Sequence, residues 1–333
     1  GPRMQRQGLK PIFPFDKFAV MGFVEVVKHL FFFFQVQHKI SKLFSTEKFD
    51  LAILVDYPGL NLRIAKMADE MRIPVLYFIC PQFWAWKHKR VYQLKDSVRY
   101  VACILPFEEE LLKIHDINSI YVGHPIAEEI KFELDRESFA RFFGLNPDKK
   151  WVGFFPGSRN NEITKMLPVY LKTVSKWNLN EYELLFSKSR SVNHQLYLSY
   201  IENYRQIKLI DGYNYEMMKY CEALICTSGT VTLEAAYIGT PMVICYKSSW
   251  LSYLIGKHFV RIKKIGLPNI LPELVQKDMN PENIYNACKR ILDNTEINAA
   301  IRKELLKLRA MLSDKHPSVE MPKIVRHLFE TYG

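Results

Sequence analysis

Short apolar runs alternate with stretches of helical character along most of the chain, and this alternation limits the fold more than any other feature. Nine runs have strand length: DLAILVD (50–56), VLYFI (75–79), YVACIL (100–105), SIYVG (119–123), VGFFPG (152–157), YELLFS (182–187), IKLID (207–211), ALICTSG (223–229) and PMVICY (241–246). Strands that are apolar throughout are typical of parallel sheets covered by helices on both faces. The sequence therefore predicts an α/β fold of doubly wound parallel sheets.

The strand pattern breaks once, between Gly123 and Trp151. The charged segment there, residues 126–150, is predicted to contain one short amphipathic helix and no strand, and we place the interdomain connection in it. A chain of 333 residues has room for about two domains. The predicted domains cover residues 1–140 and 141–315, and a C-terminal helix over 316–333 ends a helical region.

Charge and cysteine usage narrow the class of protein. Lys and Arg number 46 against 35 for Asp and Glu, a formal net charge of +11. This favours an anionic partner, which can be a nucleic acid, a phosphate-bearing ligand or an anionic membrane face. The six cysteines form no CxxC pair and most lie in apolar runs, so we expect reduced core cysteines in a cytosolic protein. No apolar run reaches the roughly 18 residues that span a bilayer, and no signal peptide is recognisable.

Residues 18–34 form a predicted amphipathic helix with an unusually wide apolar arc. One alternative packs this helix on a sheet as part of the core. The other makes it an interfacial helix that inserts aromatic and methionine side chains into a membrane while basic charge holds the protein on anionic lipid. The two are compatible if one flank is buried and the other exposed. The predicted membrane contacts are Met21, Phe23, Phe31, Phe32 and Phe33.

Asp56 is the first candidate catalytic residue. It ends the apolar run 50–56, and Pro58 and Gly59 then turn the chain into a helix. Ligands of doubly wound sheets bind at the carboxyl ends of the strands. A carboxylate at such a position can act as a general base. The alternative role is a helix cap or turn residue.

The segment FPGSRNNEI is the first of two candidate phosphate sites. The strand is expected to end at Pro156, and Gly157 and Ser158 then permit a close approach to a ligand. Arg159 stands just before a helix whose free N–H groups attract anions. Its guanidinium offers forked donors, so we interpret Arg159 as a phosphate clamp.

The segment CTSGTVTLEAA is the second candidate. Ser228, Gly229 and Thr230 would present hydroxyl and backbone N–H groups to a pyrophosphate. Glu234 lies one helical turn further on, where its carboxylate could accept hydrogen bonds from ribose hydroxyls. Either segment alone is a weak signal, but two of them in one half of the chain indicate a nucleoside diphosphate.

Asn269 lies between prolines in the segment GLPNILPELVQ. It is either a functional residue or a turn residue.

The nine histidines are scattered, without an HxxxH or paired-aspartate arrangement. We therefore expect a metal-independent mechanism. The P-loop and GxGxxG patterns are also absent, which argues against a kinase and an NAD enzyme. No cofactor is expected.

In chain order, these segments resemble those of the lipid-A-disaccharide synthases, inverting glycosyltransferases of the GT-B fold. The matching segments are GPRM, FAVMGFVEVVKHL, VDYPGLN, YFICPQFWAWKHKRV, LPFEEELL, YVGHPI, FPGSRNNEI, LICTSGTVTLEAAYIGTPMVICYK and LPNILPELVQ. The resemblance implies two Rossmann-like domains facing a cleft, the first for the acceptor and membrane, the second for the UDP-sugar. Family members begin with a strand and a GExSGD loop before GPRM, so the first domain is expected to lack its initial strand.

The resemblance also implies a reaction. A 2,3-diacylglucosamine unit would pass from its UDP derivative to 2,3-diacylglucosamine 1-phosphate, giving a β-1′,6-linked disaccharide 1-phosphate and UDP in lipid A (lipopolysaccharide) biosynthesis. By motif match, Asp56 is the family's essential acid, Arg159 its essential arginine and Asn269 a required asparagine. The residues implied to bind UDP are Ser158, Arg159, Ser228, Gly229, Thr230, Glu234 and Asn269.

The implied partners are the UDP-linked donor, the phosphorylated acceptor and an anionic membrane surface, without nucleic acid. The acyl chains of the donor and the acceptor are expected to lie along the helix 18–34. The protein is expected to be cytoplasmic and peripheral on the inner face of the inner membrane. A homodimer is also an open alternative.

Two departures from the family leave substrate detail open. Gly59 stands where relatives carry a second acid, and Cys80 and Gln82 replace serines.

Three alternative functions also remain. A UDP-sugar 2-epimerase shares this two-domain fold, a truncated remnant could keep UDP binding without catalysis, and the net charge with KHKR at 87–90 suggests a nucleic-acid-binding protein.

Overall fold

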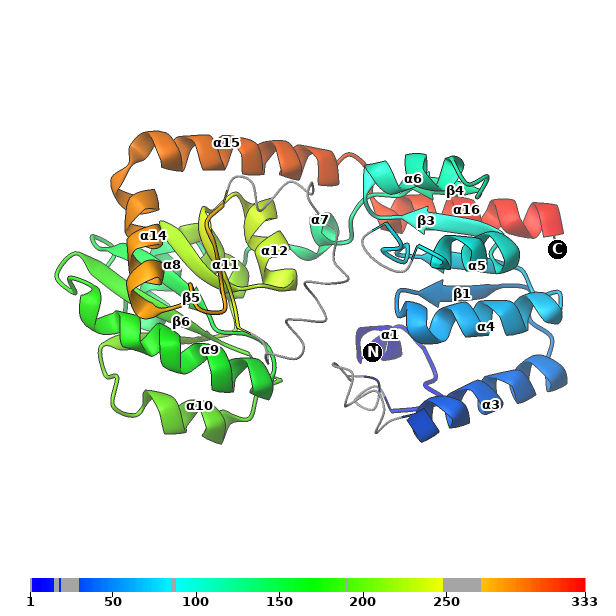
Figure 1. The fold of residues 1–333 in the computed structure, drawn as a ribbon, viewed down its shortest axis with the longest axis horizontal. Coiled ribbons are helices and arrows are strands. Elements are labelled where there is room, and N and C mark those ends of the chain that lie inside the picture. The colour runs from blue at the N-terminus through cyan, green and yellow to red at the C-terminus, as the bar shows by residue number, and fades with distance from the viewer. Residues whose placement is uncertain are drawn as a thin grey trace. The chain divides into compact units, whose positions relative to one another are not determined.

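The computed structural model describes residues 2–14, 18, 30–84, 88–189, 191–247 and 271–332. The chain divides into two compact units (Figure 1). The first comprises residues 1–122 and 318–333, and the second comprises Gly123–Pro317. The chain leaves the first unit after Val122 and returns to it at Ser318. The charged segment 126–150, in which we expected the interdomain connection, therefore follows the crossing and belongs to the second unit.

The first unit is built on a four-stranded parallel sheet. Its strands are β1 (Ala52–Val55), β2 (Val75–Phe78), β3 (Tyr100–Cys103) and β4 (Ser119–Tyr121), in the spatial order β1-β2-β3-β4. Helices follow the first three strands: α4 (Pro58–Glu70), α5 (Arg90–Ser97) and α6 (Pro106–Lys113). Because all four strands run the same way, the segments that follow them lie along one edge of the sheet.

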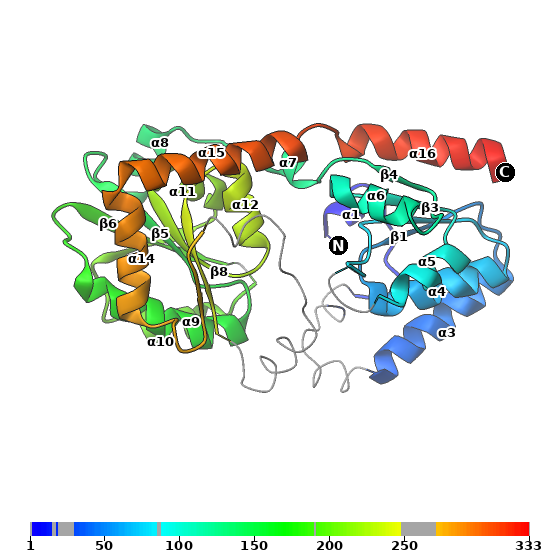
Figure 2. The same cartoon turned by 45° about the horizontal axis from the view of Figure 1, so that its top comes forward.

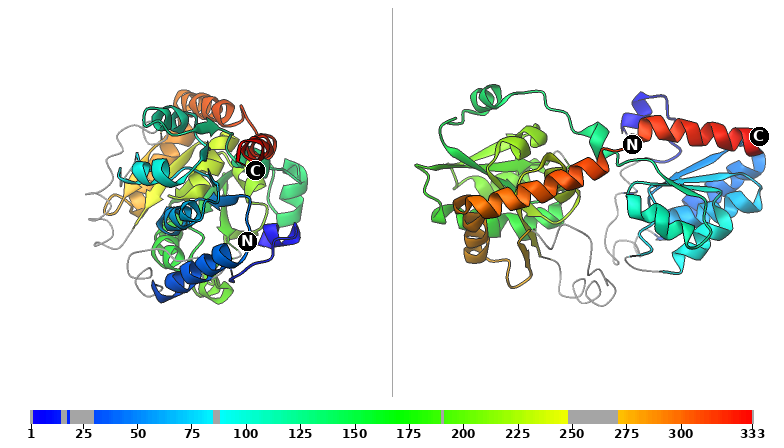
Figure 3. Two further views of the ribbon diagram at one scale, coloured as in Figure 1. Left: turned by 90° about the vertical axis from the view of Figure 1, so that its right-hand side faces the viewer. Right: turned by 90° about the horizontal axis from the view of Figure 1, so that it is seen from above.

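The two faces of this sheet are covered by different helices. Tyr77 faces a core that includes residues of α4, α5 and α6, together with Val36 from α3 (Leu30–Thr46). Leu76 faces the other side, where Ile324 and Leu328 of α16 (Pro317–Tyr332) pack (Figure 3). The C-terminal helix thus completes the core of the unit that contains the N-terminus. The short helix α1 (Pro2–Arg6) also belongs to this unit.

The second unit is built on a six-stranded parallel sheet of order β10-β9-β8-β5-β6-β7. The strands are β5 (Lys150–Phe155), β6 (Tyr182–Lys188), β7 (Ile207–Asp211), β8 (Ala223–Thr227), β9 (Met242–Tyr246) and β10 (Glu273–Val275). Strands β5 and β8 pair directly, with Phe155 opposite Cys226. These two neighbours are far apart in the sequence, whereas the other paired strands of this sheet are consecutive.

Helices cover both faces of the second sheet (Figure 2). One layer contains α9 (Asn160–Thr173), which continues into a 3-10 turn at Val174–Lys176, together with α10 (His194–Ile201) and α14 (Pro281–Asp293). The other contains α8 (Arg136–Phe143), α11 (Asn214–Tyr220), α12 (Thr230–Ile238) and α15 (Thr295–Leu312). The helix α7 (Ile126–Glu129) packs near α12. This two-sided cover explains why the strands are apolar throughout.

The structure confirms all nine predicted strands and the helical character of the last fifty or so residues. The tenth strand, β10, was not predicted, because it is three residues long and lies at a sheet edge. The segment 126–150 holds two helices rather than one, since the single turn of α7 is too short to show a period. Of the predicted helix 18–34, residues 19–29 lie outside the described part, and the described end from Leu30 onward is helical and belongs to α3, which continues to Thr46.

All six cysteines are buried and unpaired, as predicted for core residues. Cys80 and Cys103 belong to the first unit, and the other four belong to the second. Burial raises the pKa of the Cys221, Cys226 and Cys288 thiols, so these side chains stay protonated and behave as small apolar residues.

Candidate functional site

Asp56 follows β1 at the carboxyl edge of the first sheet, in a strained stretch of backbone. Asp56 and Tyr57 have φ angles of 49° and 48°, and Ile79, which follows the neighbouring strand β2, has a φ of 66°. L-residues rarely adopt this left-handed region, and each such residue costs on the order of 1–3 kcal/mol. Val55 pairs with Phe78, so the three residues sit beside one another at this edge. Strain of this kind is concentrated at functional sites.

Two side chains hold the carbonyl group of Asp56. The hydroxyl of Tyr77 donates a hydrogen bond of 2.6 Å to it, and the amide of Asn61 donates one of 2.8 Å. The same Asn61 amide lies 3.0 Å from the carbonyl oxygen of Val55. The N–H group of Asp56 donates to Phe78 and extends the β1–β2 ladder by one residue. The backbone of Asp56 is therefore bonded on both sides.

The side chain of Asp56 does not cap a helix. Tyr57 occupies the N-cap position of α4 without a side-chain cap, and Pro58 is the first helical residue, where its missing N–H costs nothing. Pro58 and Gly59 thus form the first turn of α4 rather than a turn before it. The Asp56 side chain is exposed, and among the described residues its carboxylate accepts no hydrogen bond.

Glu108 lies in the first turn of α6, which follows β3 at the same sheet edge. It is 1% exposed. Its carboxylate accepts hydrogen bonds from the Leu105 N–H at 3.2 Å and from the Trp84 indole N–H at 3.3 Å. Burial raises the pKa of Glu108 to about 7, against the lowering effect of these hydrogen bonds. Sequence reasoning missed this residue, because its burial depends on packing against a loop of another strand.

In the second unit, Arg159 follows β5 and occupies the N-cap position of α9. Its guanidinium is about half exposed and pairs with the Glu162 carboxylate at 2.8 Å. The other oxygen of Glu162 accepts from the Ser158 N–H, also at 2.8 Å. Gly157 has a φ of 124°, and a Cβ there would lie 2.6 Å from Glu162, so only glycine fits. Glu162 organises the whole segment.

The second predicted phosphate segment follows β8. Ser228, Gly229 and Thr230 are exposed, and Gly229 is the N-cap residue of α12 without a side-chain cap. The Ser228 N–H donates to the Cys245 carbonyl at 2.9 Å, so the backbone donors available for an anion are those of the helix start itself. Glu234 is partly buried further along α12, and burial raises its pKa, with the nearby Glu129 carboxylate adding to the effect.

The sheet order brings these two segments together. Because β5 and β8 are paired neighbours, the loops after them, 156–159 and 228–229, lie side by side at the carboxyl edge. The loop after β6, on the other side of β5, joins the group: the Ser191 hydroxyl donates to the Ser158 carbonyl at 2.8 Å. Arg159 and the start of α12 can therefore contact one ligand. Asn269, Met21 and Phe23 lie outside the described residues.

The described part of the aromatic tract has an inner and an outer side. Phe31 is 74% exposed and Phe34 is 57% exposed. Phe32 and Phe33 are partly buried and pack inward. They belong to an aromatic cluster that reaches the residue beside Asp56 and consists of Phe13, Phe18, Phe32, Phe33 and Tyr57.

Gly123 marks the point where the chain enters the second unit, and the sequence analysis named it only as the start of the break in the strand pattern. Its φ is 89°, and a Cβ there would lie 1.9 Å from the Lys315 carbonyl oxygen. The outgoing segment thus touches the returning segment near Lys315. His124 follows, and its Nδ1 accepts from the Ile126 N–H at 3.1 Å. Burial lowers the pKa of His124 to about 4, so the imidazole is neutral at pH 7.

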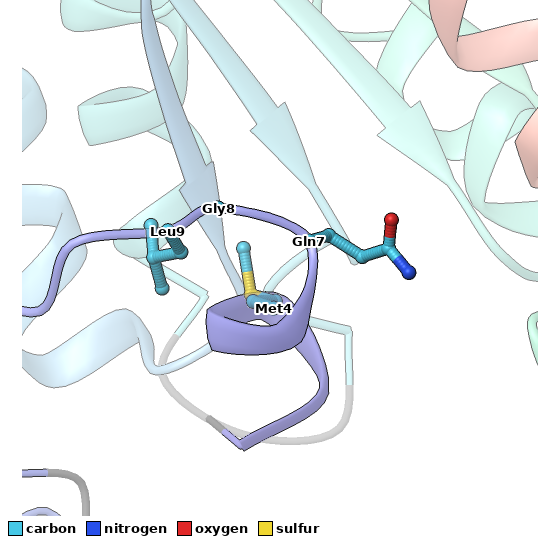
Figure 4. A pocket seen from close by; sticks show the side chains of 4 residues that line it. All are labelled: Met4, Gln7, Gly8 and Leu9. Atoms are coloured by element: carbon cyan, nitrogen blue, oxygen red, sulfur yellow. The ribbon is translucent and has the colours of Figure 1, made fainter.

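A hollow of about 560 Å³ lies in the N-terminal segment, lined by Met4, Gln7, Gly8 and Leu9 (Figure 4). None of the predicted site residues lines it.

Across the described ranges, no group of three His, Cys, Asp or Glu side chains is arranged to hold a metal ion. Within those same ranges, no helix has the length and apolar character needed to cross a membrane.

Comparison with known proteins identifies the family. The family model described as lipid-A-disaccharide synthetase matches residues 1–325. This chain belongs to that family. The lipid-A-disaccharide synthase of Nitrosococcus oceani is 36% identical over 321 residues, covering 94% of this chain and 83% of the relative. That of Trichlorobacter lovleyi is 35% identical over 339 residues, covering 99% of this chain and 88% of the relative.

Solved structures add evidence on the fold of this family member. The UDP-GlcNAc 2-epimerase from Neisseria meningitidis bound to UDP-GlcNAc superposes with a TM-score of 0.58 at 10% identity, covering 97% of this chain and 89% of that one. Arabidopsis thaliana UGT89C1 complexed with UDP-L-rhamnose gives 0.55 at 12% identity, covering 89% and 77%. At such identities the likeness concerns the fold alone, which is the predicted GT-B fold.

Proposed function

We propose that this protein transfers a 2,3-diacylglucosamine unit from its UDP derivative to the 6-hydroxyl of 2,3-diacylglucosamine 1-phosphate, as its family implies. The observation that carries the proposal is the family match, which spans both units and includes each motif described above. The products are a β-1′,6-linked disaccharide 1-phosphate and UDP. The acceptor is assigned to the first unit and the donor to the second.

The donor diphosphate is assigned to the carboxyl edge of the second sheet. Arg159 supplies a half-exposed guanidinium there, Ser228 and Thr230 supply exposed hydroxyl groups, and the N–H groups at the start of α12 supply further donors. These donors neutralise charge that grows on the departing UDP, and electrostatic stabilisation of this kind is usually the largest single contribution to catalysis. Glu234 and Asn269 complete the proposed nucleotide contacts, the former toward the ribose.

Asp56 is the proposed general base. Its carboxylate takes the proton from the acceptor 6-hydroxyl while the oxygen attacks the anomeric carbon. The bond from that carbon to the UDP oxygen breaks on the opposite face, and its electron pair leaves with UDP. One displacement inverts the configuration and needs no cofactor. An exposed carboxylate without a hydrogen-bond partner among the described residues is suited to accept this proton.

The acylated substrates call for a membrane-facing surface, and we assign it to the exposed side of α3 and the tract before it. In the described part of this surface, Phe31 and Phe34 are exposed large apolar side chains. The same face of α3 continues with the exposed basic side chains Lys39 and Lys42, which suit an anionic lipid surface. We therefore place the protein on the inner face of the inner membrane, as a peripheral protein.

The test of the reaction is a direct assay with purified full-length protein and the two acylated substrates. We expect disaccharide 1-phosphate and UDP to form in equal amounts, and the Asp56→Asn variant to lose about 10²- to 10⁴-fold in rate. Asparagine is nearly the same size and tolerates a left-handed backbone well, so the variant removes little besides the carboxylate. Unchanged turnover by this variant would exclude Asp56 as the base.

A UDP-sugar 2-epimerase activity is the second candidate, favoured only by fold-level likeness to the Neisseria meningitidis enzyme. The same purified protein, given UDP-GlcNAc without lipid, distinguishes the two. Conversion of the sugar to its 2-epimer would support the epimerase. Turnover that requires acylated substrates would support the transferase.

A further inference from the structure

We propose that Asn61 and Tyr77 are positioning residues that hold Asp56 in its left-handed backbone conformation and thereby aim its carboxylate. This inference rests on the proposed role of Asp56 as general base. Neither residue is assigned to substrate contact. Their proposed function is to act through the main chain of Asp56.

The backbone at Asp56 needs support from outside itself. Asp56 and Tyr57 are two consecutive L-residues with positive φ, and neither is glycine. Left alone, this stretch would relax toward the β or α region, because the left-handed region is disfavoured for both. Such a relaxation would rotate the Cα–Cβ bond of Asp56 and move its carboxylate.

The side chains of Asn61 and Tyr77 supply that support at one atom. A carbonyl oxygen accepts two hydrogen bonds, and at Asp56 both are used: the Tyr77 hydroxyl lies at 2.6 Å and the Asn61 amide at 2.8 Å. Fixing this oxygen fixes the plane of the peptide between Asp56 and Tyr57. That plane sets ψ of Asp56 and φ of Tyr57, and the latter is one of the two positive φ angles. The peptide before Asp56, which sets the other, is held by the Asp56 N–H bond to the Phe78 carbonyl.

Each donor is itself held firmly. Tyr77 is fully buried in the middle of the sheet, and burial raises the pKa of its phenol, so the hydroxyl keeps its proton under physiological conditions. Asn61 is in the first turn of α4, where the Asn61 N–H bonds to the Tyr57 carbonyl at 3.0 Å. Its side chain bridges the carbonyl oxygens of both Val55 and Asp56. Neither donor can follow Asp56 if its backbone relaxes.

A double-mutant cycle tests this inference. We would measure kcat and KM for disaccharide formation in full-length Asn61→Ala and Tyr77→Phe variants, each made alone and combined with Asp56→Asn. We expect each single variant to lower kcat about 10- to 100-fold with little change in KM. In the Asp56→Asn background we expect no further loss, because a positioning residue has nothing left to position.

Two control variants each remove a side-chain hydrogen-bond donor of the same type, away from the sheet edge that carries Asp56. Asn118→Ala removes an amide that donates to the Arg99 carbonyl at 3.5 Å, at the opposite edge of the same sheet. Tyr220→Phe removes a hydroxyl that donates to the Leu134 carbonyl at 2.7 Å in the second unit. We expect both to keep the parent kcat. Asn61→Asp keeps the size of the side chain and removes the N–H donor. It therefore serves as a second test if the truncation in Asn61→Ala prevents folding.

The outcomes separate this inference from the proposed function. Equal losses of kcat with and without the Asp56 carboxylate would show that Asn61 and Tyr77 serve stability only, and would overturn the inference. Unchanged kcat in Asn61→Asp and Tyr77→Phe would overturn it as well, with Asp56 still the base. Unchanged kcat in Asp56→Asn alone would overturn the proposed base, and the positioning role with it.

Discussion

The guanidinium of Arg159 lies 2.8 Å from the carboxylate of Glu162, three residues further along the chain. The second oxygen of that carboxylate accepts from the Ser158 N–H, so one acid orients both the cation and the turn. The pair is partly exposed and adds little to stability. In the proposed function, its contribution is to hold the Arg159 cation at the carboxyl edge of the sheet before the donor binds.

Arg159→Ala should abolish most of the turnover of a folded protein. The variant removes the forked cation assigned to the departing diphosphate, and loss of one such contact costs about 10²-fold or more in rate. Arg159→Lys keeps the charge but loses the fork, so we expect an intermediate rate. Steady-state kinetics with the UDP-linked donor measures both. The exposed Arg205, before β7 at the opposite sheet edge, provides a matched arginine-to-alanine control, and equal rates in both variants would contradict the assignment.

Replacing Phe31 and Phe34 with serine should lower the affinity of the protein for anionic vesicles at least tenfold. Its affinity for UDP should stay the same. Both rings are exposed, and inserting each into lipid would contribute about 1.5–3 kcal/mol. Sedimentation with vesicles measures the effect. The control pair is Phe32→Ser with Phe33→Ser: these rings pack in the aromatic cluster, so we expect a lower melting temperature. If the first pair unfolds the protein or leaves vesicle binding intact, the membrane assignment is wrong.

Glu108 should make the first unit less stable as the pH rises from about 4.5 to about 7. Its ordinary pKa is 4.5, and burial raises it to about 7 in the folded state. Below this window both states are protonated. Within it the unfolded chain loses the proton first, which favours unfolding by a total of about 3 kcal/mol at roughly 1.4 kcal/mol per pKa unit.

The Glu108→Gln variant removes this titration. Relative to the parent, its free energy of unfolding should rise by about 3 kcal/mol between pH 4 and pH 8, whatever constant offset the lost carboxylate oxygen causes. Hydrogen exchange of the β2 and β3 amides, measured at both pH values, reports opening of this unit. Glu110→Gln, on the exposed side of α6, corrects for the loss of one surface charge. A difference that does not change with pH would refute the prediction.

Gly123→Ala should destabilise the protein by roughly 2–4 kcal/mol. The added Cβ would lie 1.9 Å from the Lys315 carbonyl oxygen, and the φ of 89° suits glycine alone. The outgoing and returning segments must then separate. Thermal unfolding measures the loss, and Gly59→Ala is the matched control, because a Cβ there meets nothing within 4 Å. We expect that control to be neutral or slightly stabilising. Equal melting temperatures for Gly123→Ala and the parent would show that the two segments are not in close contact.

Much of the fold could be read from local patterns. Nine strands and the placement of Asp56, Arg159 and Ser228 after strands follow from runs of apolar residues and the polar residues that end them, which are properties of adjacent positions. The family could also be inferred from motif order. The strand β10 and the helix α7 could not, because three or four residues carry too little periodicity.

The tertiary structure alone decided what surrounds those residues. Tyr77 is one apolar strand residue among many until the β1–β2 register brings its hydroxyl to the Asp56 carbonyl. Arg159 and Ser228 lie side by side on that edge only because β5 pairs with β8 across some seventy residues of chain. Sheet order and register are set by long-range packing, and hydrophobic periodicity reports only which face of an element is buried. The residues proposed for catalysis and UDP binding were therefore visible in the sequence, whereas Glu108 and the contacts that position Asp56 and Arg159 were not.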